Sequence, residues 1–296
     1  MALLPPPHKL TSAVNFCTYI RAIRMSDVAP RAAGDAIMPA EFLTLSQIHY
    51  EAGKKHILRG VDLKLEAGRV YGLVGPNGSG KSSLLKTIAR QVDPTSGEVE
   101  LQGKAAASWG GRAFAREIAY MPQFTPATDG MTVRELVALG RFPWHGTLGR
   151  FTQVDRDLVD DAIRRTDLER FADSLVANMS GGERQRAWIA MMLAQNASCL
   201  LLDEPTSALD LAHQAGVLSL LRELSHERGL TIVVVLHDIN LAARYCDELV
   251  ALNDGRISAR GKPAEIVQSD VLKSVFGVEM GVFPHPVSNE PVSYLL

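Results

Sequence analysis

Apolar and polar residues alternate in the first strand-like stretches of the chain, which begin after residue 40. Residues 43–48 read as a strand that ends in a turn at Gly53. Residues 61–66 alternate apolar with charged side chains, which is the pattern of a half-exposed antiparallel strand. A further strand pattern spans residues 97–101. This part of the chain is therefore predicted to be rich in half-buried strands.

Three other stretches are almost continuously apolar and read as short buried strands: residues 70–74, 199–202 and 231–236. Helical patterns alternate with them at residues 82–90 and 211–227. Strands that are buried on both faces and alternate with helices are typical of a parallel sheet covered on both sides. The pattern thus predicts an α/β fold. Near the end of the chain, Asn253-Asp254-Gly255 predicts a hairpin turn.

The middle of the chain is rich in charge. Residues 134–139 and 157–171 read as helices, and the charges from Asp155 to Arg170 are expected to form a solvated helix face. His145 invites a metal assignment, but the sequence places no companion ligand near it. No metal site is therefore expected at this histidine.

Residues 1–40 differ from the rest of the chain. A run of three prolines at residues 5–7 interrupts the continuous apolar core that a signal peptide needs. This segment is therefore expected to be a disordered N-terminal extension. Two alternatives stay open: translation that starts at Met25 or Met38, and a weak amphipathic helix over residues 10–23.

The composition of the chain argues against several functional classes. The chain has 296 residues, with 31 lysines and arginines against 33 aspartates and glutamates, so its net charge is −2. This balance argues against a nucleic-acid partner held by a broad basic face. The apolar runs fall far short of the roughly 20 residues that cross a bilayer, so the chain is not expected to span a membrane by itself. Cys17, Cys199 and Cys246 are widely separated, which fits a reducing cytosol better than a disulfide framework.

The strongest chemical signal is a glycine-rich loop between the apolar strand and the helix that follows it. The loop matches the G-x-x-x-x-G-K-[ST] pattern of phosphate-binding loops at every required position: Gly75-Pro76-Asn77-Gly78-Ser79-Gly80-Lys81-Ser82. Glycines let backbone N–H groups turn toward phosphate oxygens, and the helix start adds its positive dipole end. Lys81 is predicted to reach the β- and γ-phosphates of ATP, and the Ser82 hydroxyl to bind Mg²⁺.

Two acidic residues follow the apolar strand at residues 199–202. Asp203 lies at the end of a buried strand, where an acid beside a phosphate loop is placed to hold the Mg²⁺ shell. Glu204 is then free to act as the general base that takes a proton from an attacking water. Together with the phosphate-binding loop, this pair predicts nucleotide hydrolysis.

A third stretch, Ser180-Gly181-Gly182-Glu183-Arg184-Gln185, opens an apolar helix upstream of these acids. With this stretch, residues 41–296 resemble the ATP-binding-cassette (ABC) ATPases. The resemblance implies an α/β fold with a P-loop NTPase (RecA-like) core, an antiparallel β subdomain and an inserted α-helical subdomain. It also implies a head-to-tail homodimer, in which Ser180, Gly181 and Gly182 of one chain close on the nucleotide held by the P-loop of the other.

The resemblance further implies a domain organisation. Residues 41–262 are expected to form the ABC ATPase domain, with the helical subdomain inserted at about residues 124–185. Residues 263–296 are expected to form a C-terminal extension that packs on the cassette.

The resemblance also implies roles for single residues. Gln123 is similar to the glutamine that senses the γ-phosphate and the metal, and it joins Ser82 and Asp203 as an expected Mg²⁺ ligand. His237 resembles the switch histidine that holds the γ-phosphate. The expected catalytic residues are thus Lys81, Gln123, Glu204 and His237. The expected nucleotide contacts also include Tyr50, which is similar in position to an adenine-stacking aromatic, together with Ser83 and Asp210.

Three positions depart from the family pattern. Met179 stands where leucine is usual, Glu183 stands where glutamine is commoner, and Ser83 stands where threonine is common. None of these changes removes the anion-binding groups, so ATP hydrolysis is still expected.

Three stretches that ATP chemistry does not require narrow the resemblance: residues 142–151, 236–252 and 280–286. They resemble the ATPase subunits of siderophore, haem and cobalamin importers, and within that group those of ferric-hydroxamate importers. This implies ATP hydrolysis coupled to import through a separate membrane permease, at the cytoplasmic face of a bacterial inner membrane, with a periplasmic or surface siderophore-binding protein. Import of haem, cobalamin or catecholate siderophores, and a soluble ABC regulator outside transport, stay open as alternatives.

Overall fold

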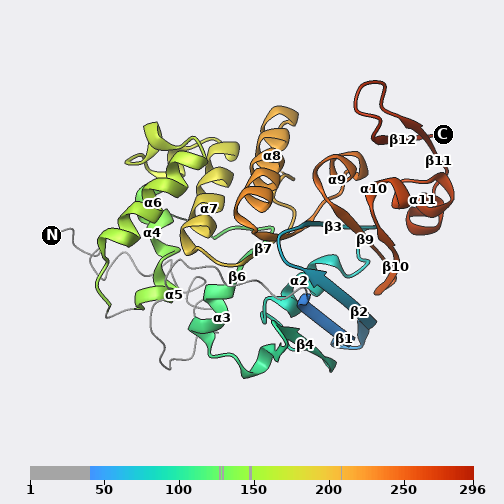
Figure 1. Cartoon of the computed structure of the whole chain (residues 1–296), viewed down its shortest axis with the longest axis horizontal. Helices are drawn as coiled ribbons and strands as arrows, with labels where there is room; N and C mark the ends of the chain where they lie inside the picture. The colour runs from blue at the N-terminus through green and yellow to red at the C-terminus, as the bar shows by residue number, and fades with distance from the viewer. Residues whose placement is uncertain (1–40, 127, 129, 147–148, 208) are drawn as a thin grey trace. The chain divides into compact units, whose positions relative to one another are not determined.

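The computed structural model describes residues 41–126, 128, 130–146, 149–207 and 209–296, so the expected N-terminal extension, with Cys17, lies outside the described residues. The chain forms two compact units (Figure 1). We call residues 41–109 and 198–296 the mixed-sheet unit, and residues 110–197 the helical unit. Among the described residues, no helix combines the length and the apolar character that crossing a membrane requires.

The mixed-sheet unit contains an antiparallel sheet with the strand order β2-β1-β4-β5. Its strands are β1 (Glu41–Ala52), β2 (Lys55–Glu66), β4 (Ser96–Leu101) and β5 (Lys104–Ala105). Leu45 of β1 lies opposite Leu63 of β2 and Val99 of β4, and all three are buried. The half-exposed strand predicted at residues 61–66 is confirmed, because apolar residues there are buried while the charged ones between them are exposed.

The second sheet of this unit is mainly parallel. Within the unit its strands lie in the order β10-β9-β3-β8-β7. They are β3 (Val70–Val74), β7 (Cys199–Leu202), β8 (Thr231–Val235), β9 (Glu248–Asn253) and β10 (Arg256–Gly261). Strands β3, β7, β8 and β9 run parallel to one another, which confirms the α/β prediction. Strand β10 is antiparallel to β9, and Asp254 and Gly255 between them have φ of +46° and +74°, as the predicted tight hairpin turn requires.

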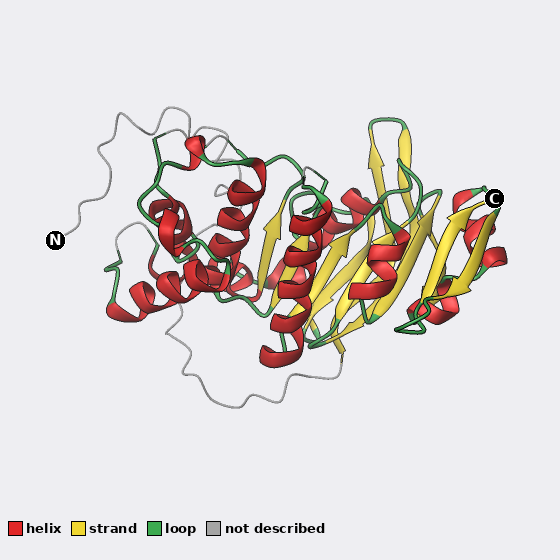
Figure 2. Ribbon diagram, turned by 90° about the horizontal axis from the view of Figure 1, so that it is seen from above, coloured by secondary structure: helices red, strands yellow, loops and turns green. Residues whose placement is uncertain are grey.

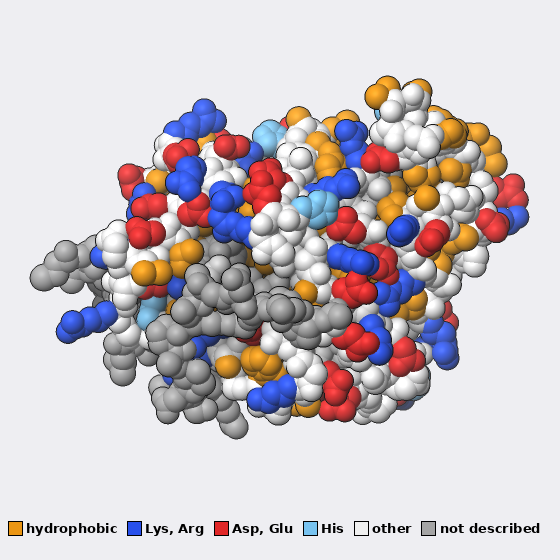
Figure 3. Space-filling model, in the orientation of Figure 1, with side chains coloured by type: hydrophobic (Ala, Val, Ile, Leu, Met, Phe, Trp, Pro, Cys, Tyr) orange, Lys and Arg blue, Asp and Glu red, His pale blue; other side chains and the backbone are white. Residues whose placement is uncertain are grey.

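Helices and a C-terminal hairpin complete the mixed-sheet unit (Figure 2). They are α2 (Lys81–Ile88), η2 (Ala106–Ser108), α8 (Leu211–Arg228), α9 (Ile239–Tyr245), α10 (Pro263–Ile266), α11 (Ser269–Phe276), β11 (Met280–Pro284) and β12 (Pro291–Leu295). The helix predicted at residues 211–227 is confirmed as α8. The hairpin exposes apolar side chains, which Figure 3 shows as an orange group over β11 and β12: Phe283, Val287, Tyr294, Leu295 and Leu296.

Two cysteines lie in the interior of the mixed-sheet unit. Cys199 begins β7 and Cys246 follows α9, and both are free thiols that are buried. Gly72 of β3 passes so close to Cys246 that a Cβ at this glycine would lie 2.8 Å from the sulfur atom. Burial raises the pKa of both thiols well above the ordinary value for cysteine.

The helical unit is built mainly from helices. Its elements are α3 (Gly111–Glu117), β6 (Ile118–Met121), α4 (Val133–Leu139), α5 (Phe142–His145), α6 (Gln153–Arg165), η3 (Glu169–Phe171), η4 (Val176–Asn178) and α7 (Gly181–Gln195). The prediction of one helix over residues 157–171 is wrong at both ends. The helix begins at Gln153, because Thr152 caps it in a reciprocal capping box with Asp155. It ends at Arg165, and a 3-10 turn then covers residues 169–171.

Candidate functional site

The glycine-rich loop connects the buried strand β3 to helix α2, as its sequence predicts. Gly75 has φ +137°, and a Cβ at this position would lie 2.0 Å from the carbonyl oxygen of Leu252 in β9. Gly80 has φ +104°, and a Cβ at this position would lie 2.9 Å from Leu58 Cδ2. Glycine is therefore required at both positions, for the backbone conformation and for space.

The turn of the loop is held by backbone hydrogen bonds. The N–H of Ser79 donates to Pro76 O at 3.2 Å, and the N–H of Gly255, in the β9–β10 turn, donates to Ser79 O at 3.1 Å. The Ser79 hydroxyl is buried and has no hydrogen-bond partner among the described residues. A buried hydroxyl of this kind is a donor available to a bound anion.

Helix α2 opens with an electropositive end. Its N-cap, Gly80, makes no side-chain capping bond, and no acidic residue lies in the first turn. The first N–H groups of a helix lack partners within the helix and carry its positive dipole end. This end of α2 is therefore suited to a phosphate.

Lys81 lies against the loop that it follows. Its Nζ donates to the carbonyl oxygens of Gly75 and Pro76, at 2.9 Å each, and the residue is only 5% exposed. Burial lowers the pKa of Lys81 below the ordinary value, and the charges of Glu204 and Asp203 partly offset this shift. The ammonium group is thus bound to its own loop and feels the charges of both acids.

Ser82 and Asp203 meet as the sequence predicts. The Ser82 hydroxyl donates to Asp203 Oδ1 at 2.8 Å. Asp203 is 2% exposed, and burial raises its pKa, against the lowering effect of the Ser82 hydrogen bond and two lysines. A hydroxyl and a carboxylate oxygen are the hard ligands that Mg²⁺ takes in nucleotide sites. The donor set and the buried negative charge fit this ion.

Glu204 and His237 form a second close pair at the carboxyl ends of β7 and β8. His237 Nε2 lies 2.6 Å from Glu204 Oε1, with the glutamate largely buried and the histidine more exposed. Glu204 has φ +53°, an uncommon conformation for a residue with a side chain. The N–H and hydroxyl of Ser207 both donate to Glu204 O, at 3.3 and 3.2 Å, and hold this turn. The carboxylate is thus held in a defined position.

The remaining predicted contacts of this unit lie in β1, α2 and the start of α8. Tyr50 lies in β1, opposite Leu58 of β2. Ser83 follows Ser82 in the first turn of α2. Asp210 is the N-cap of α8 and accepts a hydrogen bond from His213 N at 2.9 Å. Hydrogen bonds from His213 lower the pKa of Asp210 below the ordinary value.

Two groups of predicted site residues belong to the helical unit. Gln123 is exposed and follows β6. Ser180 is the N-cap of α7, and Gly181 and Gly182 form its first turn. The Ser180 hydroxyl donates to Glu183 Oε2 at 2.8 Å, while Glu183 N donates back to the hydroxyl at 3.3 Å. The departure to glutamate at position 183 therefore completes a capping box, whose hydrogen bonds lower the pKa of Glu183.

Comparison with known proteins shows which family the chain belongs to. The family described as ABC transporter matches residues 58–207. An achromobactin transport ATP-binding protein of Dickeya dadantii (strain 3937) is 45% identical over 236 residues, which are 80% of this chain and 88% of the relative. The chain belongs to the ABC transporter family. It is an ATPase whose hydrolysis of ATP is coupled to transport.

Two further relatives of this ABC ATPase carry names with other cargoes. An iron(3+)-hydroxamate import ATP-binding protein of Bacillus subtilis (strain 168) is 40% identical and aligns with 84% of this chain and 93% of its own. A ferric enterobactin transport ATP-binding protein of Escherichia coli (strain K12) is 40% identical, with coverage of 81% and 89%.

Solved structures agree with the ABC ATPase fold. A putative metal-chelate type ABC transporter in an inward-facing conformation has a TM-score of 0.76 and 26% identity, and aligns with 87% of this chain and 98% of its own. A dimeric ATP-binding cassette bound to ADP and Pi in a post-hydrolysis state has a TM-score of 0.67 and 30% identity, with coverage of 75% and 98%. The predicted P-loop fold class is confirmed.

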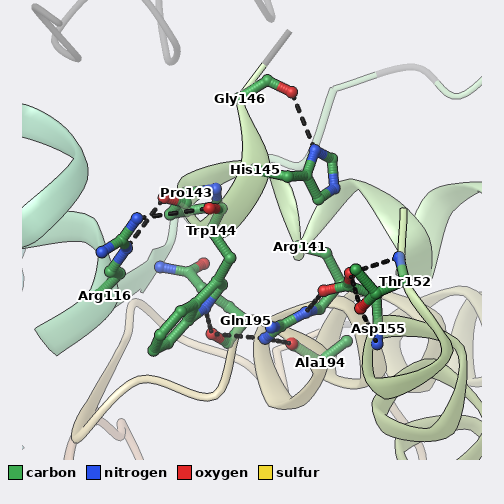
Figure 4. Close-up of polar contacts among 10 residues, drawn as sticks. All are labelled: Arg116, Arg141, Pro143, Trp144, His145, Gly146, Thr152, Asp155, Ala194 and Gln195. Atoms are coloured by element: carbon green, nitrogen blue, oxygen red, sulfur yellow. Dashed lines mark hydrogen bonds and ion pairs between the residues drawn. The ribbon is translucent and has the colours of Figure 1, made fainter. Parts of the chain in front are cut away.

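One cluster of this ABC ATPase was missed by the sequence reasoning, and it lies in the helical unit (Figure 4). Arg141 Nε donates to Asp155 Oδ1 at 2.9 Å, with both side chains buried. Arg141 also donates to Ala194 O at 2.8 Å, at the carboxyl end of α7, where a cation is favourable. We call Arg116, Arg141, Trp144, Asp155 and Gln195 the Arg141 cluster.

Trp144 lies between two guanidinium groups in the Arg141 cluster. Its ring centroid is 4.9 Å from Arg116 Cζ and 5.0 Å from Arg141 Cζ, and its Nε1 donates to Gln195 O at 2.7 Å. The expectation that Asp155 belongs to a solvated face is wrong, because Arg141 neutralises it in the interior. Burial alone would raise the pKa of Asp155, yet hydrogen bonds from Thr152 and Arg141 bring it below the ordinary value. The signal available in the sequence was the Thr152-x-x-Asp155 capping box.

Proposed function

We propose that the chain is the ATP-hydrolysing subunit of an importer that takes up ferric siderophores of the hydroxamate class through a separate membrane permease. The observation that carries the ATPase part is the convergence of three groups in the mixed-sheet unit: the loop with Lys81, the Ser82–Asp203 pair and the Glu204–His237 pair. The relative named for iron(3+)-hydroxamate import supports the choice of cargo.

ATP binds with its phosphates in the loop from Gly75 to Ser83. Backbone N–H groups at the start of α2 and the Ser79 hydroxyl donate to phosphate oxygens, and Lys81 leaves its own loop carbonyls for the β- and γ-phosphates. Ser82, Asp203 and Gln123 would hold Mg²⁺, which neutralises phosphate charge when bound. Tyr50 stacks on adenine.

Hydrolysis requires a base beside the γ-phosphate. Glu204 accepts a proton from the attacking water as the water oxygen bonds to Pγ, and the bond from Pγ to the β,γ-bridging oxygen breaks to release ADP. His237 donates to the γ-phosphate and orients Glu204, whose Oε1 lies 2.6 Å from its Nε2. The left-handed backbone of Glu204 is the kind of strain that accompanies a positioned catalytic group.

Two copies of the chain form each pair of sites. Ser180, Gly181 and Gly182 at the positive end of α7 bind the γ-phosphate held by the partner copy, with Asp210 beside the shared interface. A dimeric solved cassette, 30% identical to this chain, supports this arrangement. Closure of the dimer acts on a membrane permease through Gln123 and the helical unit, at the cytoplasmic face of an inner membrane. A periplasmic or surface siderophore-binding protein delivers the cargo.

Growth on defined iron sources tests the cargo. We expect a strain without the gene to lose growth on a ferric hydroxamate as sole iron source, and a plasmid copy to restore it. A Glu204→Gln copy should fail to restore growth although it is expressed at the same level. Growth of the deletion strain on the hydroxamate, with no redundant ATPase present, would overturn the hydroxamate assignment.

Achromobactin is the second candidate cargo, because the relative named for it is 45% identical whereas the hydroxamate relative is 40% identical. The same deletion strain separates the two when it is grown on achromobactin, enterobactin and hemin in parallel. Loss of growth on achromobactin alone would replace the hydroxamate proposal.

A further inference from the structure

The C-terminal hairpin, formed by β11 and β12, is hydrogen-bonded to α9, the helix that follows His237. Three hydrogen bonds join the side chain of Asn240, in the first turn of α9, to one residue of β12, Ser293. Asn240 Oδ1 accepts from the N–H of Ser293 at 2.8 Å and from its hydroxyl at 3.0 Å, and Asn240 Nδ2 donates to Ser293 O at 3.0 Å. Helix α9 and strand β12 are both labelled in Figure 1.

The contact uses all the polar groups of Ser293. This residue is 5% exposed, and its N–H, C=O and hydroxyl would each be costly to bury without a partner. One amide side chain satisfies all three, since it offers an acceptor oxygen and a donor nitrogen side by side. Substituting Asn240 therefore removes these three hydrogen bonds between α9 and the middle of β12, while the strand pairing of β11 with β12 keeps the hairpin itself intact.

Asn240 is coupled to His237 through a short and well-braced segment. The N–H of Leu236 donates to Leu73 O at 3.1 Å, which fixes the chain immediately before the histidine. Immediately after it, Asp238 caps α9 and accepts from the N–H groups of Asn240 and Leu241, at 2.7 and 3.1 Å. No flexible loop therefore separates His237 from the hydrogen bonds that Asn240 makes to β12.

We propose that Asn240 is a positioning residue for ATP hydrolysis, and that the hairpin of residues 280–295 holds His237 in place through it. The inference rests on the proposed roles of His237 and Glu204. The C-terminal hairpin thereby becomes part of the support of the hydrolytic pair, although none of its residues is placed at the nucleotide.

Steady-state ATP hydrolysis by the purified full-length chain tests the proposal. Asn240→Ala should lower kcat about tenfold, because even small displacements of a catalytic group are costly. The KM for ATP and the affinity for a fluorescent ATP analogue should change less than about twofold, since the phosphate loop is untouched. Ser293→Ala removes one of the three bonds and should give a smaller loss of kcat.

Ser288→Ala is the matched control for the hairpin, because the Ser288 hydroxyl donates to Glu290 Oε2 within the turn rather than to α9. It should keep wild-type kcat. Thermal unfolding of each variant shows whether a loss of kcat accompanies general destabilisation. A folded Asn240→Ala chain whose affinity for ATP falls as much as its kcat would overturn the positioning role.

A double-mutant cycle with His237→Ala separates positioning from a general structural effect. If Asn240 acts through His237, adding Asn240→Ala to His237→Ala should lower the remaining rate less than about twofold. An equal tenfold loss in both backgrounds would overturn the inference. Wild-type turnover by His237→Ala would instead overturn the proposed role of the histidine, whereas impaired His237→Ala with normal Asn240→Ala would overturn only the inference.

Discussion

At the scale of single residues, the site depends on backbone conformations that few residues adopt. Glu204 has φ +53° and Gly75 has φ +137°. Neighbouring atoms restrict the movement of the backbone at both residues. Glu204 is fixed by Ser207 on one side and His237 on the other. The chemistry of these residues therefore follows from their fixed positions as much as from their side chains.

Replacing the proposed base while keeping its shape tests its role. Glu204→Gln should lower kcat by at least about 100-fold, because an amide cannot take the proton from water. ATP binding should be retained, and the closed dimer should accumulate, as gel filtration with ATP would show. Lys81→Ala is the contrasting variant and should lose ATP binding itself. Hydrolysis by Glu204→Gln at the wild-type rate would contradict the assignment.

The close approach of the loop to β9 gives a prediction about stability. Gly75→Ala should lower the free energy of unfolding by roughly 2–5 kcal/mol, because the new methyl group meets the Leu252 carbonyl and the φ angle is strained. Gly78→Ala also has a positive φ, +79°, but meets open space, so it should cost only about 1–2 kcal/mol. Urea denaturation of both variants measures the difference. Equal losses of unfolding free energy in the two variants would contradict the prediction, because they would show that the clash with the Leu252 carbonyl is relieved.

At the scale of elements, the helical unit depends on an internal ion pair. Arg141 follows α4 and Asp155 lies in the first turn of α6, and neither side chain is more than 7% exposed. The pair also caps two helices, because Asp155 accepts from Thr152 N at 2.8 Å while Arg141 binds the last turn of α7. The ion pair therefore connects the segment that follows α4 with α6 and α7.

Removing one charge of this pair should be severe. Asp155→Asn leaves a buried guanidinium without its counter-ion, which is expected to cost about 3–5 kcal/mol. Asp157→Asn, on an exposed part of the same helix, should change the free energy of unfolding by less than about 0.5 kcal/mol. Urea denaturation followed by circular dichroism compares them. A loss below about 1 kcal/mol for Asp155→Asn would contradict the importance of the pair.

The same pair gives a dependence on pH. Because the pKa of Asp155 is lowered in the folded chain, its contribution to stability is complete above the pKa of the unfolded state, about 3.9. The contribution is lost as the pH falls through the lower folded pKa. The difference in unfolding free energy between wild type and Asp155→Asn should therefore be constant near neutral pH and shrink below about pH 4. A difference that grows on acidification would contradict this sign.

The contrast between the two units shows what sequence reasoning could reach. The loop from Gly75 to Ser82 was predicted in place because all its parts are adjacent in the chain. The Arg141 cluster was missed because Arg141 and Asp155 are 14 residues apart and belong to no common helix. Helix α6 begins at Gln153, earlier than predicted, because the capping box of Thr152 rather than the charge pattern sets its start. Long-range pairing and capping geometry, rather than hydrophobic period, decided these positions.

At the scale of the whole molecule, the proposed sites are shared between two copies of the chain. The loop with Lys81 belongs to the mixed-sheet unit and Ser180 to Gly182 belong to the helical unit. In a symmetric head-to-tail dimer, each site combines the loop of one copy with the α7 start of the other. Two differently damaged chains can then complement each other.

Mixing two inactive variants tests this arrangement. Lys81→Ala damages the loop, while Gly182→Asp places a negative charge at the start of α7, which a helix tolerates but a phosphate does not. A mixed dimer contains one site with both defects and one intact site. We expect the mixture to recover up to about a quarter of the wild-type rate, although each variant alone is inactive. No recovery in a mixture shown to contain mixed dimers would contradict shared sites.

The buried thiols of the mixed-sheet unit have a practical consequence. Reagents that label cysteine react with the thiolate, and Cys199 and Cys246 combine burial with a raised pKa. These two cysteines of the described residues are therefore expected to react slowly with labelling reagents, which favours the use of site-directed probes. A label attached to a Ser288→Cys variant would report hairpin movement during ATP turnover without competition from Cys199 or Cys246.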